Sequence, residues 1–150
     1  MLSQTAEHAI RALLYLAGES ADRAASTDEV ATAIDAPRNY LAKTLNALAR
    51  VGILSSTKGP GGGYQLRVAP DDLAVSRVIE EFDPPAERHM CLLGGRPCDA
   101  EHPCAAHDRW VEMWRRSREP LRHTMLADLL GERLPAVACG DSHPFLQLTR

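Results

Sequence analysis

The sequence lacks several features that would each define a class of protein. No apolar run is long enough to cross a bilayer, and no basic stretch followed by an apolar segment opens the chain. The two common phosphate-loop patterns, GxxxxGK[ST] and GxGxxG, are absent, as is any nucleophile-base pair of the kind that enzymes use. We therefore expect a cytoplasmic protein that has no membrane contact and is not an enzyme.

Strong charge of either sign is also missing, since the net charge is only −3, which by itself argues against binding to nucleic acid. The 45% of apolar residues and 25% of charged residues describe one ordinary domain that can bury a core. The chain has four cysteines. In a reducing compartment, four cysteines favour metal or redox chemistry over structural disulfides.

Three of those cysteines lie close together in a stretch rich in glycine and proline. Six residues separate Cys91 from Cys98, and five separate Cys98 from Cys104. Structural zinc usually uses tighter pairs, whereas iron-sulfur clusters are held by thiolates spread along such loops, and a histidine can serve as the fourth ligand. The spacing favours an iron-sulfur cluster and leaves a zinc site or a metal-free set of redox-sensing thiols as alternatives.

The N-terminal third of the chain reads as three helices. Apolar residues recur at helical spacing over residues 5–18. A capping box predicts a second helix ending near Ile34, in which the Ser26 hydroxyl accepts from the backbone of Glu29 and the Glu29 carboxylate bonds back. A turn at residues 35–37 leads into a third helix, for which Gly52 is a left-handed cap.

The third helix has two different faces. Leu41, Leu45 and Leu48 share one face at the helical period, and polar or cationic residues occupy the other. Two short helices joined by a tight turn, with amide and cationic side chains outward on the second, are typical of a helix-turn-helix that reads the major groove. Residues 36–67 contain no acid and five cations, a local charge pattern that suits phosphates. These cations are Arg38, Lys43, Arg50, Lys58 and Arg67.

Two short extended runs, residues 53–58 and 64–68, flank a glycine-rich tip and predict a β-hairpin. A helix-turn-helix followed by a hairpin is a winged helix. A fourth helix is predicted from its cap at residues 70–72 to Phe82, with Pro84 and Pro85 beyond its end.

The C-terminal third is predicted to be helical from about residue 103, with Pro120 ending or kinking the long helix and a short helix at residues 124–130. Trp110, Met113 and Trp114 lie on one stripe of the long helix. So much aromatic area in a small domain favours packing against a second copy of the chain over ordinary core packing. Cys139 lies in a loose tail and is interpreted as a bystander.

The order of these motifs resembles a known family. The helix-turn-helix, the wing sequence Lys58-Gly-Pro-Gly-Gly-Gly-Tyr64 and the three-cysteine loop are similar to those of the bacterial winged-helix transcription regulators that include IscR and NsrR. The resemblance covers residues 1–130, although the gap between the first two cysteines is one residue longer than in IscR. It implies a homodimer whose iron-sulfur cluster controls its affinity for DNA.

The resemblance also implies a ligand set, which consists of Cys91, Cys98, Cys104 and a fourth residue. IscR-like members use a histidine at the place of His107, and NsrR-like members use an acidic residue, donated by the partner subunit, at the place of Glu7. Imidazole suits iron better than an oxygen donor does in such a soft site. We therefore favour His107 and a 2Fe-2S cluster, with Glu7 and a 4Fe-4S cluster as the alternative.

Together these observations predict a mainly α-helical protein with a small β-hairpin wing. Its expected parts are a winged helix-turn-helix domain (residues 1–83), a cluster-binding loop (84–107), a dimerisation helix region (108–131) and a loose tail (132–150). The expected function is a DNA-binding regulator, acting as a repressor, whose cluster senses redox state, nitric oxide or iron-sulfur status. A cluster-free thiol- or zinc-sensing regulator and a redox metalloprotein without DNA function are the alternatives.

The expected DNA target is a double-stranded operator with an inverted repeat, because a two-fold dimer presents two recognition helices. Asn39, Lys43 and Asn46 are expected at base edges, and the other contacts at the backbone or the minor groove. The predicted DNA-binding residues are Arg38, Asn39, Tyr40, Lys43, Asn46, Arg50, Lys58, Gly59, Gly61, Gly62 and Tyr64.

Overall fold

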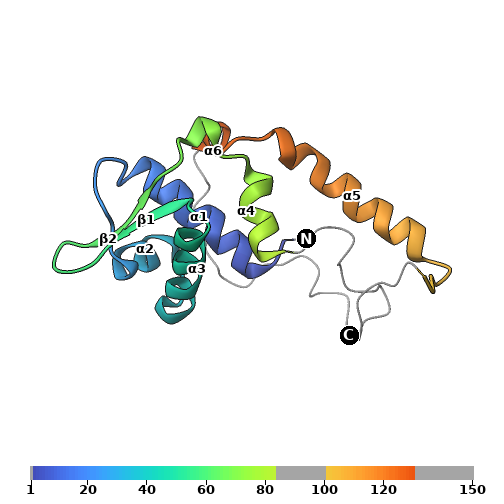
Figure 1. Ribbon diagram of the computed structural model, residues 1–150, viewed down its shortest axis with the longest axis horizontal. Coiled ribbons are helices and arrows are strands. Elements are labelled where there is room, and N and C mark those ends of the chain that lie inside the picture. Colours follow the sequence, from blue (N-terminus) through green and yellow to red (C-terminus); the bar gives the residue numbers. More distant parts are fainter. Residues whose placement is uncertain (1, 84–100, 131–150) are drawn as a thin grey trace, which may run out of the picture.

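The computed structural model describes residues 2–83 and 101–130, and Figure 1 shows how their elements are arranged. Its first elements are α1 (Gln4–Gly18), α2 (Thr27–Ile34), α3 (Arg38–Arg50), β1 (Leu54–Thr57) and β2 (Gly63–Leu66). They are followed by the 3₁₀ turn η1 (Pro70–Asp72), α4 (Val75–Phe82), α5 (His107–His123) and α6 (Leu126–Leu130). The prediction of a mainly helical winged helix-turn-helix with a small hairpin is confirmed.

Several predictions fall outside the described residues. They concern the two prolines after α4, three cysteines and the loose tail at residues 132–150. The single residues among them are Pro84, Pro85, Cys91, Cys98 and Cys139.

The core lies between α1 and α3, which also contact the two strands of the hairpin. Leu13 and Leu16 of α1 and Leu41 and Leu45 of α3 are completely buried, and Leu126 joins them from α6 at the other end of the described chain. Each such side chain contributes about 1.5–3 kcal/mol when it leaves water. The predicted apolar face of the third helix is therefore the face that anchors it, and its opposite face is left outward.

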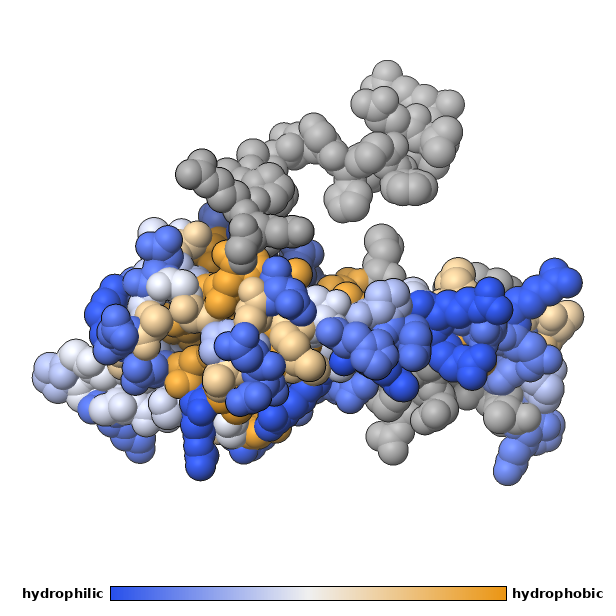
Figure 2. Space-filling model, turned by 90° about the horizontal axis from the view of Figure 1, so that it is seen from above, coloured by the Kyte–Doolittle hydropathy of each residue, from blue (hydrophilic) through white to orange (hydrophobic). Residues whose placement is uncertain are grey.

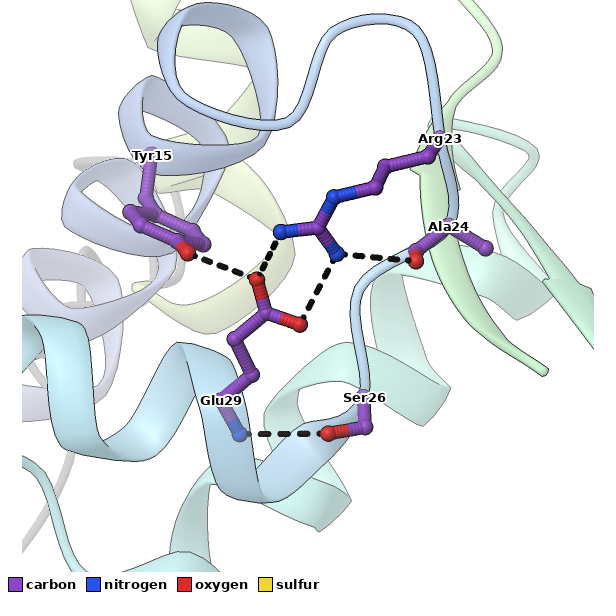
Figure 3. A network of polar contacts seen from close by, with 5 residues as sticks. All are labelled: Tyr15, Arg23, Ala24, Ser26 and Glu29. Atoms are coloured by element: carbon purple, nitrogen blue, oxygen red, sulfur yellow. Dashed lines mark hydrogen bonds and ion pairs between the residues drawn. The ribbon is translucent and has the colours of Figure 1, made fainter. Parts of the chain in front are cut away.

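The start of α2 has the predicted capping box. The Ser26 hydroxyl accepts a hydrogen bond from the Glu29 backbone nitrogen at 3.2 Å, as expected. The Glu29 carboxylate also accepts from the Arg23 guanidinium and from the Tyr15 hydroxyl, which donates to it at 2.8 Å (Figure 3). Hydrogen bonds from Arg23, Tyr15 and the Ser26 backbone together lower the pKa of this carboxyl, so a cation and a phenol from outside α2 share it with the box.

Two residues with positive φ set the turns on either side of α3. Asp35 ends α2 in the left-handed region, with φ 53° and ψ 54°, and so turns the chain tightly into α3. Gly52 follows α3 with φ 78°, where glycine meets no Cβ penalty, as predicted. These two turns fix the angle between α2 and α3 and the exit of the chain into β1.

The wing is an antiparallel hairpin in which Leu54 pairs with Leu66 and Ser56 pairs with Tyr64. The segment before α2 joins the hairpin as a third chain segment. The Ala25 backbone nitrogen donates to the Tyr64 carbonyl at 2.9 Å, and the Tyr64 nitrogen donates to the Ala25 carbonyl at 2.8 Å. A Cβ on Gly63 would lie 2.2 Å from the Ala25 carbonyl oxygen. Glycine at this position therefore lets the segment before α2 pair closely with the wing.

The predicted fourth helix is interrupted, which corrects the reading of residues 70–82 as one helix. Between η1 and α4 the chain is extended, and Leu73 is completely buried there. The carbonyl of Leu73 accepts from Leu126 at 2.8 Å, and the Val75 nitrogen donates to Thr124 at 2.9 Å. Pairing with the segment before α6 takes the backbone groups that a continuous helix would have used for itself.

Of the two predicted effects of Pro120, ending or kinking the long helix, the first does not occur, since α5 continues through Pro120 to His123. One end of α5 connects to α6, the helix packs along α4, and its start extends away from the winged-helix body (Figure 1). Figure 2 shows hydrophobic residues gathered over that body, while the visible face of α5 is mainly hydrophilic. Among the described helices, none is long and apolar enough to cross a membrane.

Candidate nucleic-acid interface and metal-binding residues

The outward face of α3 carries the side chains that the sequence assigned to base recognition. Asn39, Lys43, Asn46 and Arg50 are exposed, while the leucines of the same helix are buried. Amides and cations on an exposed helix face can bond base edges and phosphates. The structure therefore brings the predicted residues of α3 to one surface.

Arg38 has an acidic partner, although the stretch of sequence around it contains no acid. Its guanidinium forms an ion pair with the Asp28 carboxylate of α2, and both side chains are more than half exposed. The absence of acids from residues 36–67 thus does not describe the charge around Arg38, because the fold supplies an acid from the preceding helix. The cost of breaking such an exposed pair is small.

Tyr40 links α3 to α1. Its hydroxyl bonds the Thr5 hydroxyl, and its ring meets the His8 ring edge to face, with centroids 5.7 Å apart and planes at 77°. His8 is buried, with 7% of its surface exposed, while Tyr40 keeps 37%. Tyr40 therefore anchors α3 to α1 while part of its surface stays exposed.

Wing and recognition helix are joined by one side-chain hydrogen bond. The Tyr64 hydroxyl of β2 donates to Oδ1 of Asn46 at 2.9 Å. Both residues were predicted to contact DNA, but their contact with each other was not predicted. The bond connects residues 18 positions apart, for which no local spacing rule applies.

The tip of the wing depends on glycine. Gly59 and Gly61 have φ of 100° and 77°, and a Cβ on Gly62 would lie 2.2 Å from the Thr57 carbonyl oxygen. Lys58 follows β1 directly and is exposed. A cation beside a compact glycine tip can approach a phosphate backbone closely.

Of the predicted cluster ligands, the structure describes Cys104, His107 and Glu7, while Cys91 and Cys98 lie outside it. Cys104 is half-buried and precedes α5, and its carbonyl accepts from the His107 nitrogen at 2.9 Å. Thiol and imidazole thus stand one turn apart at the start of a helix. Over residues 2–83 and 101–130, no three histidine, cysteine or acidic residues gather closely enough to hold a metal ion.

Glu7 occupies the first turn of α1 and is exposed. Figure 1 shows the beginning of α1 beside the winged-helix body and the beginning of α5 at the far end of the molecule. One chain therefore does not bring Glu7 and His107 together. If both belong near a cluster, Glu7 has to come from a second copy.

The residues on α5 assigned to the dimer interface form a small aromatic group. The Trp110 and Trp114 rings are 6.2 Å apart at 78°, and the Arg118 guanidinium lies 5.0 Å from the Trp114 ring. Met113 is 50% exposed, and no described residue of α5 is fully buried. The stripe is present as predicted, and one chain leaves it partly uncovered.

The cationic residues beside this stripe are paired with an acid of the same helix. Glu112 accepts from Arg116 at 2.6 Å and from Arg115 at 2.9 Å. The hydrogen bonds from Arg116 and Arg115 lower the pKa of the Glu112 carboxyl. Exposed arginines that pair with an acid three or four residues away on the same helix are typical of a solvated helix face.

Sequence reasoning missed the residues that position the site from other elements. Asp28 pairs with Arg38, Thr5 and His8 hold Tyr40, and Tyr15 holds Glu29. All of these contacts join different helices. The only signal available in the sequence was the amphipathic pattern that placed the helices together.

Comparison with known proteins gives a consistent result. Residues 2–132 match the sequence model of the Rrf2 family, which is described as "Iron-dependent Transcriptional regulator". A protein of Aquifex aeolicus named as an HTH-type transcriptional regulator is 34% identical over 132 residues, which cover 87% of this chain and 91% of that one. The HTH-type transcriptional regulator IscR of Aliivibrio salmonicida is 26% identical over 129 residues, covering 86% and 76% of the two chains.

Among solved structures, CymR of B. subtilis, described as the global cysteine regulator, matches with a TM-score of 0.68. It is 22% identical and the match covers 87% of this chain and 95% of CymR. At that identity the likeness establishes the fold.

Proposed function

This chain belongs to the Rrf2 family of transcriptional regulators, and from that membership we propose that it is a DNA-binding homodimer, acting as a repressor, whose operator affinity is controlled by an iron-sulfur cluster. The predicted resemblance to IscR-type regulators is confirmed, and so is the prediction that the protein is not an enzyme. The observation that carries the DNA-binding proposal is the exposed polar face of α3 beside the glycine wing.

We propose that Lys43 and Asn46 contact base edges and that Lys58 contacts the phosphate backbone. Base contacts discriminate between sequences, whereas phosphate contacts strengthen binding to any DNA. We therefore expect Lys43→Ala and Asn46→Ala each to lose about 1–3 kcal/mol of discrimination between operator and random DNA. Lys58→Ala should weaken both complexes nearly equally and reduce the salt dependence of binding.

This division is measured by titrating labelled operator and random duplexes with each variant at several salt concentrations. Arg77→Ala, which removes a cation from α4, is the matched control. Equal losses on both duplexes for all three variants would contradict the assignment of roles.

The ligand residues of this chain fit an iron-sulfur cluster by their chemistry. Cys91, Cys98 and Cys104 offer three thiolates, and His107 stands one turn after Cys104 at the start of α5. A bound cluster supplies one-electron chemistry and reactivity toward oxidants. Imidazole in place of a thiolate lowers the negative charge of the ligand set and so raises the reduction potential, which favours His107 and a 2Fe-2S cluster in a sensor.

Anaerobic purification, followed by a visible absorption spectrum and iron and sulfide assays, tests for the cluster. His107→Ala and Glu7→Ala then identify the fourth ligand. We expect His107→Ala to shift the spectrum or destabilise the cluster while Glu7→Ala leaves it unchanged. The opposite result would assign the site to Glu7, with a ligand set that bridges two subunits and a 4Fe-4S cluster.

A cluster-free regulator that senses thiol oxidation or zinc is the alternative, and two observations favour it. Cys104 is a half-buried free thiol, and the same fold is found in CymR, a protein described as a cysteine regulator. This alternative predicts protein that binds operator DNA and contains no iron or sulfide. Zinc analysis and thiol titration before and after mild oxidation separate its two forms.

A further inference from the structure

We propose that Tyr64 of the wing is a positioning residue for base recognition, which holds the Asn46 amide so that it presents hydrogen-bond donors to the operator. The inference rests on the proposed function, because it requires α3 to lie in the major groove. It adds a specificity-determining role to a residue otherwise expected only to contact DNA.

The first step is the geometry of the contact. The 2.9 Å bond from the Tyr64 hydroxyl to Oδ1 of Asn46 lies within the normal range for a hydrogen bond between two oxygen atoms. It directs the carbonyl end of the amide toward the wing. The amide is planar and its other end is the Nδ2 group, which keeps both hydrogens for further partners. On the exposed face of α3, those hydrogens are the groups that remain for a ligand.

The second step is the rigidity of the group that holds Asn46. Tyr64 bonds Ala25 through both its backbone nitrogen and its carbonyl, and it pairs with Ser56 on the other side. Its backbone is therefore fixed from two sides, and its ring has only two torsions left. Asn46 by itself is an exposed side chain that can rotate freely. The wing thus fixes the orientation of a recognition side chain that α3 does not fix.

The third step is the consequence for the base. An unrestrained asparagine pairs with adenine through two bonds, in which its oxygen accepts from N6 and its nitrogen donates to N7. The bond from Tyr64 turns Oδ1 toward the wing, so the two-bond pairing with adenine, which needs Oδ1 at the base edge, is disfavoured. For donation from Nδ2, guanine offers two acceptors at O6 and N7, adenine N7 and thymine O4 offer one each, and cytosine offers none. The base that Asn46 approaches should therefore be guanine in preference to adenine or thymine, and least of all cytosine.

The experiment selects binding sites from a randomised duplex library with full-length wild-type protein, Tyr64→Phe, Asn46→Ala and the double variant. Wild-type protein should select guanine and reject cytosine at the position where Asn46→Ala loses its preference. Tyr64→Phe frees Oδ1 and should shift that position toward adenine by about two- to ten-fold, which is the effect of one ordinary hydrogen bond. The double variant should match Asn46→Ala at that position.

Tyr15→Phe is the matched control, because it removes a hydroxyl bonded to Glu29 and leaves Asn46 untouched. Its selected sequences should equal those of the wild type. Two results overturn the inference alone: a Tyr64→Phe profile identical to that of the wild type, or a uniform loss of affinity for every sequence including random DNA. A folded wild-type protein that selects no sequence overturns the proposed function, and this inference with it.

Discussion

At the scale of single residues, the charge around the recognition helix is set by contacts between helices. Arg38 lies in a stretch without acids, yet its guanidinium pairs with Asp28 from α2. Exposed ion pairs contribute little to stability, because water screens both charges. If Arg38 contacts DNA as proposed, we expect a phosphate to replace Asp28 easily, and we expect Asp28 to weaken DNA binding by occupying Arg38 and by adding a negative charge beside α3.

Asp28→Asn is accordingly expected to strengthen DNA binding. Removal of the acid frees Arg38, so operator and random DNA should both bind more tightly, by at most about five-fold, and the salt dependence should become steeper. Titration of both duplexes at several salt concentrations measures the effect. Asp71→Asn, which removes the same charge from η1 on the α6 side, is the control, and an equal gain from that variant would show a general charge effect.

A second residue-scale prediction concerns acid. Hydrogen bonds from Arg23 and then Tyr15 lower the pKa of Glu29 from 4.5 to about 2. Because the folded pKa lies below the unfolded one, the ionised network stabilises the fold above about pH 4.5, and this contribution is lost as the pH falls toward about 2. Glu29→Gln should therefore lower the free energy of unfolding at neutral pH, and its difference from the wild type should shrink between pH 4.5 and 2.

Urea unfolding followed by circular dichroism across that range checks this expectation. Glu19→Gln is the matched control, because it makes the same exchange at an exposed end of α1, outside the network of Arg23, Tyr15 and Glu29. A deficit of Glu29→Gln that stays constant from neutral pH to pH 2 would assign the effect to packing of the side chain rather than to its charge.

At the scale of elements, the wing is positioned by its pairing with the segment before α2. The Ala25 backbone bonds that of Tyr64 in both directions, so the hairpin is attached to the helix-turn-helix instead of projecting freely. Gly63 lies so close to that segment that a Cβ on it would clash with the Ala25 backbone. This contact fixes the wing relative to α3 and thereby makes the bond between Tyr64 and Asn46 possible.

Gly63→Ala should break this attachment. The added Cβ would lie 2.2 Å from the Ala25 carbonyl oxygen and 2.5 Å from its carbon, and backbone atoms cannot move aside without losing the paired bonds. We expect a loss of stability on the order of 3 kcal/mol and weaker operator binding. Gly61→Ala, where φ is 77° and no atom is near, should cost only about 1 kcal/mol. Urea unfolding compares the two, and a smaller loss for Gly63→Ala would refute this account of the wing.

At the scale of the whole molecule, α5 is the helix whose aromatic stripe one chain leaves partly exposed. It spans His107–His123, none of its described residues is fully buried, and Met113 is half exposed beside the two tryptophans. Helices gain most of their stability in proteins from packing an apolar face. A second copy that covers this stripe would supply that packing and would place two recognition helices on one DNA duplex.

Replacement of Trp110 and Trp114 by glutamate should therefore yield monomers that bind operator DNA weakly. The expected operator is an inverted repeat with half-sites about 10 bp apart, and loss of the dimer removes the joint binding of both halves. Light scattering measures the mass, and titration of full and half operators measures the binding. Arg77→Glu, which introduces the same charge at an exposed position of α4, is the control and should remain dimeric. A tryptophan variant that stays dimeric would show that Trp110 and Trp114 pack within the single chain and not at a dimer interface.

The sequence alone determined the features that depend on neighbouring residues. Helix caps, the glycine after α3, the division of α3 into a leucine face and a polar face, and the glycine wing all follow rules that act over a few residues. Such rules act on backbone hydrogen bonds and side chains one turn apart, so a linear pattern records them. The resemblance carried by the wing and the three cysteines identified the family for the same reason, because both motifs are continuous in sequence.

Only the tertiary structure decided which distant residues meet. Tyr40 bonds Thr5 across 35 positions, Tyr64 bonds Asn46 across 18, and Asp28 reaches Arg38 from another helix. The chain at Leu73 is extended rather than helical because its carbonyl bonds Leu126. Each of these contacts depends on how packed helices are oriented, and that orientation results from burial of the whole core, to which no single spacing in the sequence corresponds.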